Sequence, residues 1–162
     1  MPAAPTDRVR NVVVLGHTGT GKSTLVEAML RTAGVASGPV DGCPTLDTEP
    51  QERARGHTLS LSVATFAFDD HVVTVLDTPG LAEAIGDAWP ATAAADLAII
   101  VVDATVGLQP QHTEAWDLCE QAGLPRLVFL NKLDLDRAQY GERVAELRET
   151  WGEHLATVQL PW

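Results

Sequence analysis

Short apolar runs recur along the chain, and polar or helix-forming stretches separate them. Such runs are typical of strands in a parallel sheet whose two faces are both covered. The runs that fit this description are residues 9–15, 71–76, 95–102 and 127–130. The longest unbroken one, 97–102, is far too short to cross a bilayer. The pattern therefore predicts a soluble domain built around buried strands.

Between these runs, three segments carry apolar residues at helical spacing. Residues 23–33 and 110–122 each precede a glycine, which favours the left-handed conformation at a helix end. A third helix is predicted from one apolar stripe, formed by Tyr140, Val144, Leu147 and Trp151. Strands that alternate with helices predict an α/β fold, with a mostly parallel sheet and helices on both faces.

One part of the pattern predicts an antiparallel pair. Apolar residues alternate with polar ones over residues 58–68, but the phase changes between Val63 and Phe66. This change predicts a β-bulge near Ala64-Thr65. Asp69-Asp70 predicts a tight turn into the next apolar run, so the two strands should form a hairpin.

The remaining segments set the expected domain limits. Residues 1–8 read as a flexible N-terminal tail, and residues 9–162 read as a single domain whose last strand covers 157–160. Residues 35–56 contain three prolines and no sustained period. An irregular stretch of this length is usually functional or mobile, and we interpret it as a switch segment, with a flexible insertion as the alternative.

Composition narrows the class of partner. The net charge of −11 argues against a surface that grips nucleic acid, because phosphate contacts need clustered Lys and Arg. Cys43 and Cys119 have no metal-site spacing and no disulfide framework, so we expect both to be reduced. The N-terminus lacks the apolar segment of a secretory signal, and a cytoplasmic location is expected.

Three short motifs follow predicted strands and carry the candidate chemistry. The first fits the pattern G-x-x-x-x-G-K-[ST] of a phosphate-binding loop. Together with the residue that follows it, the loop comprises Gly16, His17, Thr18, Gly19, Thr20, Gly21, Lys22, Ser23 and Thr24. The second motif is Asp77-Thr78-Pro79-Gly80, and the third is Asn131-Lys132-Leu133-Asp134. Since ligands of α/β sheets bind at the carboxyl ends of strands, the three motifs are expected to form one pocket.

The first two motifs suit a triphosphate and its magnesium ion. Glycines let backbone N–H groups approach phosphates, and Lys22 can reach the β- and γ-phosphates. The Ser23 hydroxyl can bind Mg²⁺, and Asp77 can hold the same ion through water. The Gly80 N–H can meet the γ-phosphate. A Gly-rich turn with a surface lysine is the alternative interpretation of the loop.

The third motif suits guanine. The Asp134 carboxylate can accept from both N1–H and the 2-amino group of guanine, whereas adenine offers neither donor. Asn131 is the second specificity residue, and Lys132 is expected to lie over the base. A turn that caps a helix is the alternative, and an ATPase remains open if Asp134 faces away from the base.

These motifs resemble the nucleotide-binding loops of translational GTPases, which are P-loop NTPase G domains. Residues 51–58 and 158–161 further resemble the elongation factor G branch. The resemblance implies that Thr58 binds Mg²⁺ when GTP is present; a threonine that only begins the next strand is the alternative. The resemblance therefore implies Ser23, Thr58 and Asp77 at the metal, GTP, GDP and Mg²⁺ as ligands, and the ribosome as a partner. Lys22, Thr58 and Gly80 are the implied catalytic residues.

The chain departs from that family at two positions that bear on hydrolysis. Leu81 stands where translational GTPases usually have a histidine that orients the attacking water, and Gly19 replaces the usual loop aspartate. Loss of a positioned acid–base group costs roughly 10²–10⁴-fold in rate. We therefore predict a slow elongation factor G-like GTPase, with a GTP/GDP-binding switch module as the alternative.

Two further expectations concern the rest of the molecule. The resemblance implies a domain that is incomplete at its C-terminus, because the family's Ser-Ala loop that touches guanine comes after Trp162. Neither sequence-specific binding to nucleic acid nor a membrane partner is expected. The remaining histidines are interpreted as loop, strand-end or surface residues: His57, His71, His112 and His154.

Overall fold

The structure is a computed structural model that describes residues 5–35, 61–80 and 85–161, except for the side chains of residues 85–87. Its strands are β1 (Val9–Leu15), β2 (Ser62–Phe68), β3 (His71–Asp77), β4 (Leu97–Asp103) and β5 (Arg126–Asn131). Its helices are the 3₁₀ turn η1 (Thr6–Arg8) and the α-helices α1 (Lys22–Thr32), α3 (Ile85–Ala93), α4 (Pro110–Gln121) and α5 (Tyr140–Trp151). The predicted strands and helices are present with end shifts of one or two residues. There are two exceptions. No strand forms at 157–160, and the strand predicted at 58–68 begins only at Ser62, with residues 58–60 outside the described residues.

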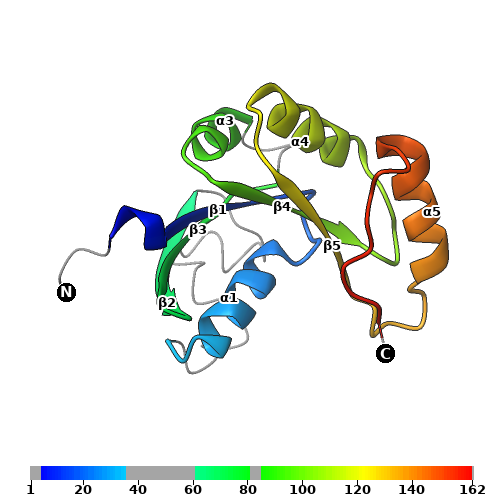
Figure 1. Ribbon diagram of the computed structural model, residues 1–162. Coiled ribbons are helices and arrows are strands. Elements are labelled where there is room, and N and C mark those ends of the chain that lie inside the picture. The colour runs from blue at the N-terminus through cyan, green and yellow to red at the C-terminus, as the bar shows by residue number, and fades with distance from the viewer. Residues whose placement is uncertain (1–4, 36–60, 81–84, 162) are drawn as a thin grey trace.

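The strands form one sheet in the order β2-β3-β1-β4-β5 (Figure 1). β1 pairs in parallel with both β3 and β4, and β4 pairs in parallel with β5. Only the β2–β3 pair is antiparallel among the described strands. This confirms the predicted mostly parallel α/β sheet. It also brings the carboxyl ends of β1, β3, β4 and β5 to one edge.

Helices cover both faces of the sheet, as the apolar runs predict. On one face, Val26 and Leu30 of α1 pack against Val14, Val75 and Val101 of the central strands. The three strand valines are almost fully buried, so this layer excludes water from the helix that follows the phosphate loop.

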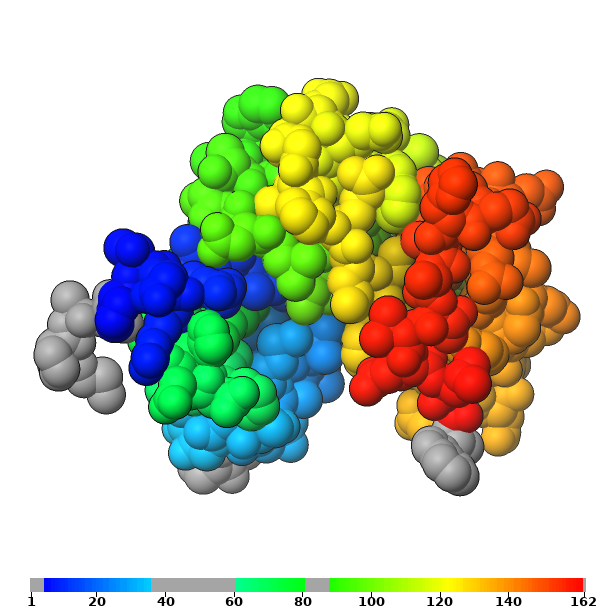
Figure 2. All heavy atoms as spheres, viewed as in Figure 1, coloured from blue at the N-terminus to red at the C-terminus, as the bar shows by residue number. Residues whose placement is uncertain are grey.

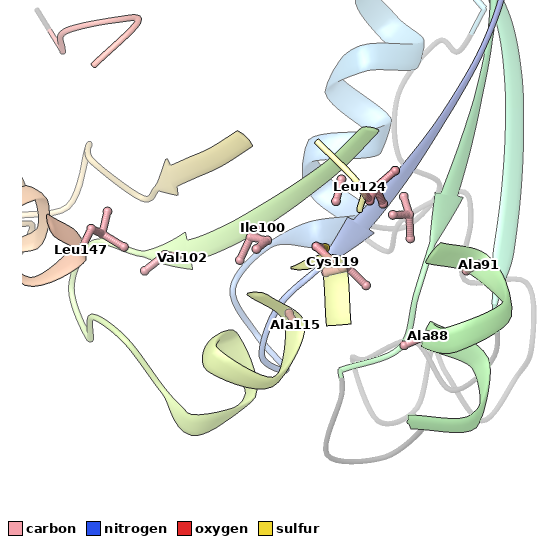
Figure 3. Close-up of a cluster of buried hydrophobic side chains, with 11 residues drawn as sticks. Ala88, Ala91, Ile100, Val102, Ala115, Cys119, Leu124 and Leu147 are labelled. Carbon is pink, nitrogen blue, oxygen red and sulfur yellow. The ribbon is translucent and has the colours of Figure 1, made fainter. Parts of the chain in front are cut away.

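The other face is covered by α3, α4 and α5. Figure 3 shows Ala115 and Cys119 of α4 near Ile100 of β4, while Ala88 and Ala91 extend the same cluster onto α3. Small residues let these helices approach the strands closely. Leu147 and Trp151 of α5 pack in the same cluster, whereas Tyr140 and Val144 line a hollow next to β5, so the predicted apolar stripe of residues 140–151 packs on the core only in part.

The β2–β3 hairpin corrects the predicted bulge. Its register is continuous from Ser62 opposite Asp77 to Phe68 opposite His71, so no residue is extra. The phase change arises because Val63 lies on a poorly covered part of this edge strand, where its side chain is 58% exposed. The predicted two-residue turn at Asp69-Asp70 is confirmed, with φ of 46° and 62°.

The C-terminal segment corrects a second expectation. Residues 157–160 pair with no described strand, and Val158 and Leu160 are 81% and 71% exposed. Figure 2 shows this red segment at the surface beside α5. Apolar alternation alone does not make a strand here, because the segment has neither backbone pairing nor a buried face. A hollow of about 600 Å³ separates it from β5 and α5.

Other expectations fall where the structure describes little. At the N-terminus the described part of residues 1–8 includes the η1 turn. The predicted switch segment, residues 35–56, lies almost wholly outside the described residues, as do Cys43, His57, Thr58 and Leu81. Among the described residues, no helix has the length and apolar character needed to cross a membrane.

Candidate nucleotide-binding site

The phosphate loop connects β1 to α1, as its motif requires. Gly21 directly precedes α1 with a φ of +93°, in the left-handed region that glycine adopts without strain. A Cβ at this position would collide with the Asn131 side chain. The loop therefore needs glycine here for both its backbone angle and its closeness to β5.

Hydrogen bonds around one carbonyl organise the loop. The Thr20 hydroxyl donates to the His17 carbonyl at 2.9 Å, and the Lys22 ammonium donates to the same oxygen at 3.1 Å. Lys22 is 6% exposed, so its charge lies inside the loop rather than in solvent. The N–H groups at the start of a helix and a buried ammonium together favour an anion at this place.

The Asp77–Gly80 segment lies directly against the phosphate loop. Asp77 and Thr78 are fully buried at the end of β3, and the Thr78 hydroxyl donates to the Val14 carbonyl at 2.7 Å. A Cβ on Gly80 would collide with the Thr18 hydroxyl and lie 2.8 Å from the Thr18 nitrogen. The structure thus brings the second motif onto the first, and a side chain at Gly80 would push them apart.

The Asn131–Asp134 segment contacts the phosphate loop from the β5 side. The Asn131 side-chain amide donates to the Thr20 carbonyl at 2.8 Å, and the Lys132 ammonium donates to the Gly19 carbonyl at 2.7 Å. Asp134 is exposed, and no hydrogen bond or ion pair joins its carboxylate to a described residue. Its carboxylate is therefore available to a ligand.

Asp103, at the carboxyl end of β4, is a site residue that the sequence reasoning missed. Its carboxylate accepts from the Lys132 ammonium at 2.6 Å. Burial opposes its ionisation, but hydrogen bonds from Lys132 and Thr105 outweigh burial and lower the pKa of Asp103. The signal was present in the sequence, because Asp103 ends an apolar run just as Asp77 does.

His112 is the second residue missed, and its interpretation as a surface or strand-end residue is wrong. It is fully buried in the first turn of α4, and its Nε2 lies 3.5 Å from the backbone nitrogen of His17 in the phosphate loop. Its Nδ1 accepts from the Gln109 N–H at 2.9 Å, and its Nε2 donates to the Val101 carbonyl at 3.1 Å. Spacing was the available signal, because the buried residues of α4 are His112, Ala115 and Cys119.

Burial lowers the pKa of His112, and the nearby charges of His17 and Lys22 act in the same direction. The neutral ring, with its one proton on Nε2, can donate to the Val101 carbonyl and accept from the Gln109 N–H at the same time. A second proton on Nδ1 would face the Gln109 N–H, which already donates there. His112 therefore supports the floor of the phosphate loop as a neutral residue.

The site is distinguished by its chemistry, not by its volume. A small cavity of about 50 Å³ borders the phosphate loop near Gly107 and His112. The larger hollow of about 600 Å³ lies beyond β5 and includes no phosphate-loop residue. The phosphate loop, by contrast, contacts both of the other motifs.

Comparison with known proteins is consistent with this arrangement. The family model of the elongation factor Tu GTP binding domain matches residues 7–159. The chain belongs to this family. It is an elongation-factor-type GTPase domain, which confirms the resemblance drawn from the three motifs.

Individual relatives agree with the family. The chain is 37% identical to an elongation factor G-like protein of Mycobacterium tuberculosis (strain H37Rv), over 98% of this chain and 23% of that protein. It is 35% identical to a mitochondrial ribosome-releasing factor 2 of Drosophila ananassae, over 95% and 21%. A crystal structure of a Thermus thermophilus protein superposes with a TM-score of 0.82 at 37% identity, over 90% and 22%. The chain thus spans less than a quarter of the length of these relatives.

Proposed function

We propose that this domain binds GTP and GDP, with Mg²⁺, at the edge where its three motifs meet. The observation that carries the proposal is the direct contact of the phosphate loop with both other motifs. Asn131 reaches the Thr20 carbonyl at 2.8 Å, and Gly80 packs on Thr18 with no room for a Cβ. One nucleotide can therefore touch all three motifs at once.

Each end of the proposed site suits a different part of the nucleotide. Lys22 and the first N–H groups of α1 would hold the phosphates. Asp134 would accept two hydrogen bonds from guanine, and its exposed carboxylate is available for them. Lys132 would cover the base from its position above Gly19, to whose carbonyl it donates at 2.7 Å.

The residues present also fit a magnesium ion. Asp77 supplies a carboxylate at the strand end, and Ser23 supplies a hydroxyl in the first turn of α1. Mg²⁺ at phosphate sites is typically bound through one or two carboxylates, and substrate phosphates and water molecules fill much of its coordination shell. The described residues contain no cluster of three or more acidic, histidine or cysteine side chains, and this mode of binding requires none. When bound, the ion would neutralise charge on the phosphates; Thr58 is the third proposed ligand.

We further propose that GTP hydrolysis is slow. Leu81 has no group that can orient water, while the phosphate, metal and guanine contacts do not involve this position. Nucleotide binding is therefore expected to survive where rapid turnover does not. The alternative function, a switch module with little hydrolysis, rests on the same residue.

The proposed partner is the ribosome, in the cytoplasm. The name of the ribosome-releasing relative supports this partner. The acidic net charge of −11 favours contact through a limited patch rather than a broad phosphate-binding surface.

Titration with fluorescent GDP in Mg²⁺ tests binding. The wild-type chain should bind, and Lys22→Ala should weaken binding at least about 10²-fold, because a buried charge-assisted contact to phosphate is lost. The chain has no lysine outside the proposed site that could serve as a matched control, because Lys22 and Lys132 are its only lysines. Arg10→Ala, on the exposed part of β1, serves instead and should leave affinity unchanged.

Single-turnover hydrolysis with and without ribosomes then separates the two functions. If the domain is a GTPase, ribosomes should increase the rate of GTP hydrolysis. If it is a switch module, it should bind GTP, and ribosomes should leave the rate of hydrolysis unchanged. Wild-type protein that fails to bind GDP would contradict both.

A further inference from the structure

An ion pair joins the end of β4 to the beginning of the third motif, Asn131–Asp134, which is called the guanine motif from here on. The Lys132 ammonium donates to the Asp103 carboxylate at 2.6 Å and to the Gly19 carbonyl at 2.7 Å. One ammonium thus bridges three loops: the phosphate loop, the loop after β4 and the loop after β5. The side chains of Asp103 and Lys132 are 10% and 33% exposed, so water screens this pair only in part.

Asp103 is itself held in place from the opposite side. One carboxylate oxygen accepts from the Thr105 N–H at 2.8 Å and from the Thr105 hydroxyl at 2.6 Å. The other oxygen accepts from Lys132. Bonds to both oxygens orient the carboxylate, and the lowered pKa of Asp103 keeps it charged at neutral pH.

The backbone of Lys132 makes such an anchor necessary. Its φ is +61°, a left-handed conformation that residues other than glycine, asparagine and aspartate adopt at a cost. Neighbouring contacts must maintain this conformation. Asn131 contributes through the Ala104 N–H, which donates to its carbonyl at 2.9 Å, and Asp103 holds the side-chain end.

We propose that Asp103 is a positioning residue for nucleotide binding, which holds Lys132 across the phosphate loop at Gly19 so that the phosphate and guanine motifs act as one preformed surface. The inference rests on the proposed function, because it assigns a role within the same site. Asp103 would not touch the nucleotide. It would act through Lys132, by reducing the conformational freedom that binding would otherwise have to remove.

A second ion pair in the molecule provides a matched control. Arg143 and Glu146 of α5 form a contact of 2.7 Å, and Glu146 also accepts from the Leu108 N–H at 3.2 Å. This pair likewise fastens the loop after β4, yet it touches neither the phosphate loop nor the guanine motif. If the Asp103–Lys132 pair contributed only to stability, its loss and the loss of the Arg143–Glu146 pair would have the same effect: a lower unfolding temperature and an unchanged Kd for GDP.

The test is a double-mutant cycle on GDP affinity, with the fold of each variant checked by thermal unfolding. Asp103→Asn should raise the Kd for GDP about tenfold, because a charge-assisted hydrogen bond is roughly twice as strong as a neutral one. The Kd for GTP should rise by the same factor, since Asp103 lies at the base end of the site. In a Lys132→Met background, Asp103→Asn should change the Kd less than about twofold. Glu146→Gln should leave the Kd unchanged and lower only the unfolding temperature.

The outcomes distinguish the inference from the function on which it rests. Wild-type protein that does not bind GDP refutes the proposed function. If the wild-type protein binds GDP, two results refute only the role of Asp103. One is a Kd of Asp103→Asn within twofold of the wild-type Kd. The other is an equal loss of affinity from Asp103→Asn in the wild-type and the Lys132→Met backgrounds. Should Asp103→Asn fail to fold, Thr105→Val removes the 2.6 Å donor and keeps both charges. It should weaken GDP binding about two- to fivefold, a loss that should vanish with Lys132→Met, and an unchanged Kd would refute the role.

Discussion

Replacement of Gly80 by alanine tests whether the second motif must lie in direct contact with the phosphate loop. The new Cβ would collide with the Thr18 hydroxyl and stand 2.8 Å from the Thr18 nitrogen and 3.0 Å from its Cα. The hydroxyl can rotate away, but the two backbone atoms cannot. The collision must therefore move one of the two loops.

The expected magnitude follows from this geometry. Overpacking of a rigid contact costs about 1–3 kcal/mol of unfolding free energy. For a domain of this size, 1 kcal/mol lowers the melting temperature by about 2–4 °C, so the variant should melt roughly 2–12 °C earlier. Because the displaced atoms include the phosphate loop, affinity for GTP should fall about tenfold or more.

Thermal unfolding followed by circular dichroism and titration with labelled GTP measure the two effects. Gly141→Ala is the matched control, because Gly141 lies in α5 and a Cβ there would meet nothing within 4 Å. That variant should gain up to about 1 kcal/mol from helix propensity and bind nucleotide normally. A second variant, Thr18→Ala with Gly80→Ala, should recover only part of the loss, since the backbone contacts remain. Gly80→Ala protein with wild-type melting and affinity would refute the reasoning.

Two further predictions concern buried ionisable groups. The pKa of His112 is lower in the folded protein than in the unfolded chain. As the pH falls below about 6.5, the unfolded chain therefore binds a proton at His112 that the folded protein does not bind, and the free energy of unfolding decreases. Urea unfolding at pH 7.5 and 5.5 should therefore show a loss of up to about 1.4 kcal/mol per pH unit that is absent from His112→Gln; equal losses in both proteins would contradict this assignment. Burial raises the pKa of the Cys119 thiol to about 11, so thiol reagents should modify it only after unfolding, and rapid labelling of the Cys43→Ser variant in its folded state would contradict the burial.

Much of the fold was predictable because burial on two faces leaves a clear record in the sequence. Residues 97–102, which form all of β4 except its last residue, are apolar throughout, and residues 98–102 alternate between the two cores on either side of the sheet. The three motifs were predictable because each needs particular residue types at a strand end. Parallel pairing then brings them to one edge without further information.

The errors arose where residue type and environment disagree. Val63 is apolar but exposed on an edge strand, and this produced the false bulge. Residues 157–160 alternate like a strand, yet no described strand pairs with them. His112 is polar but buried, and its ring is satisfied by the backbone of Gln109 at the helix end and of Val101 in β4. Such pairings depend on the tertiary arrangement, which single-residue patterns do not encode.

The central claim is that the carboxylate of Asp134 selects guanine. Calorimetry with GDP and ADP in Mg²⁺, on wild-type protein and on Asp134→Asn, tests it most directly, with Asp136→Asn as an exposed neighbouring control. Two charge-assisted hydrogen bonds of about 1.5–3 kcal/mol each predict that wild-type protein binds GDP about 10²–10⁴-fold more tightly than ADP. Asp134→Asn should lose most of that preference and Asp136→Asn none of it. Equal affinity of the wild-type protein for GDP and ADP, or binding of neither, would contradict the account.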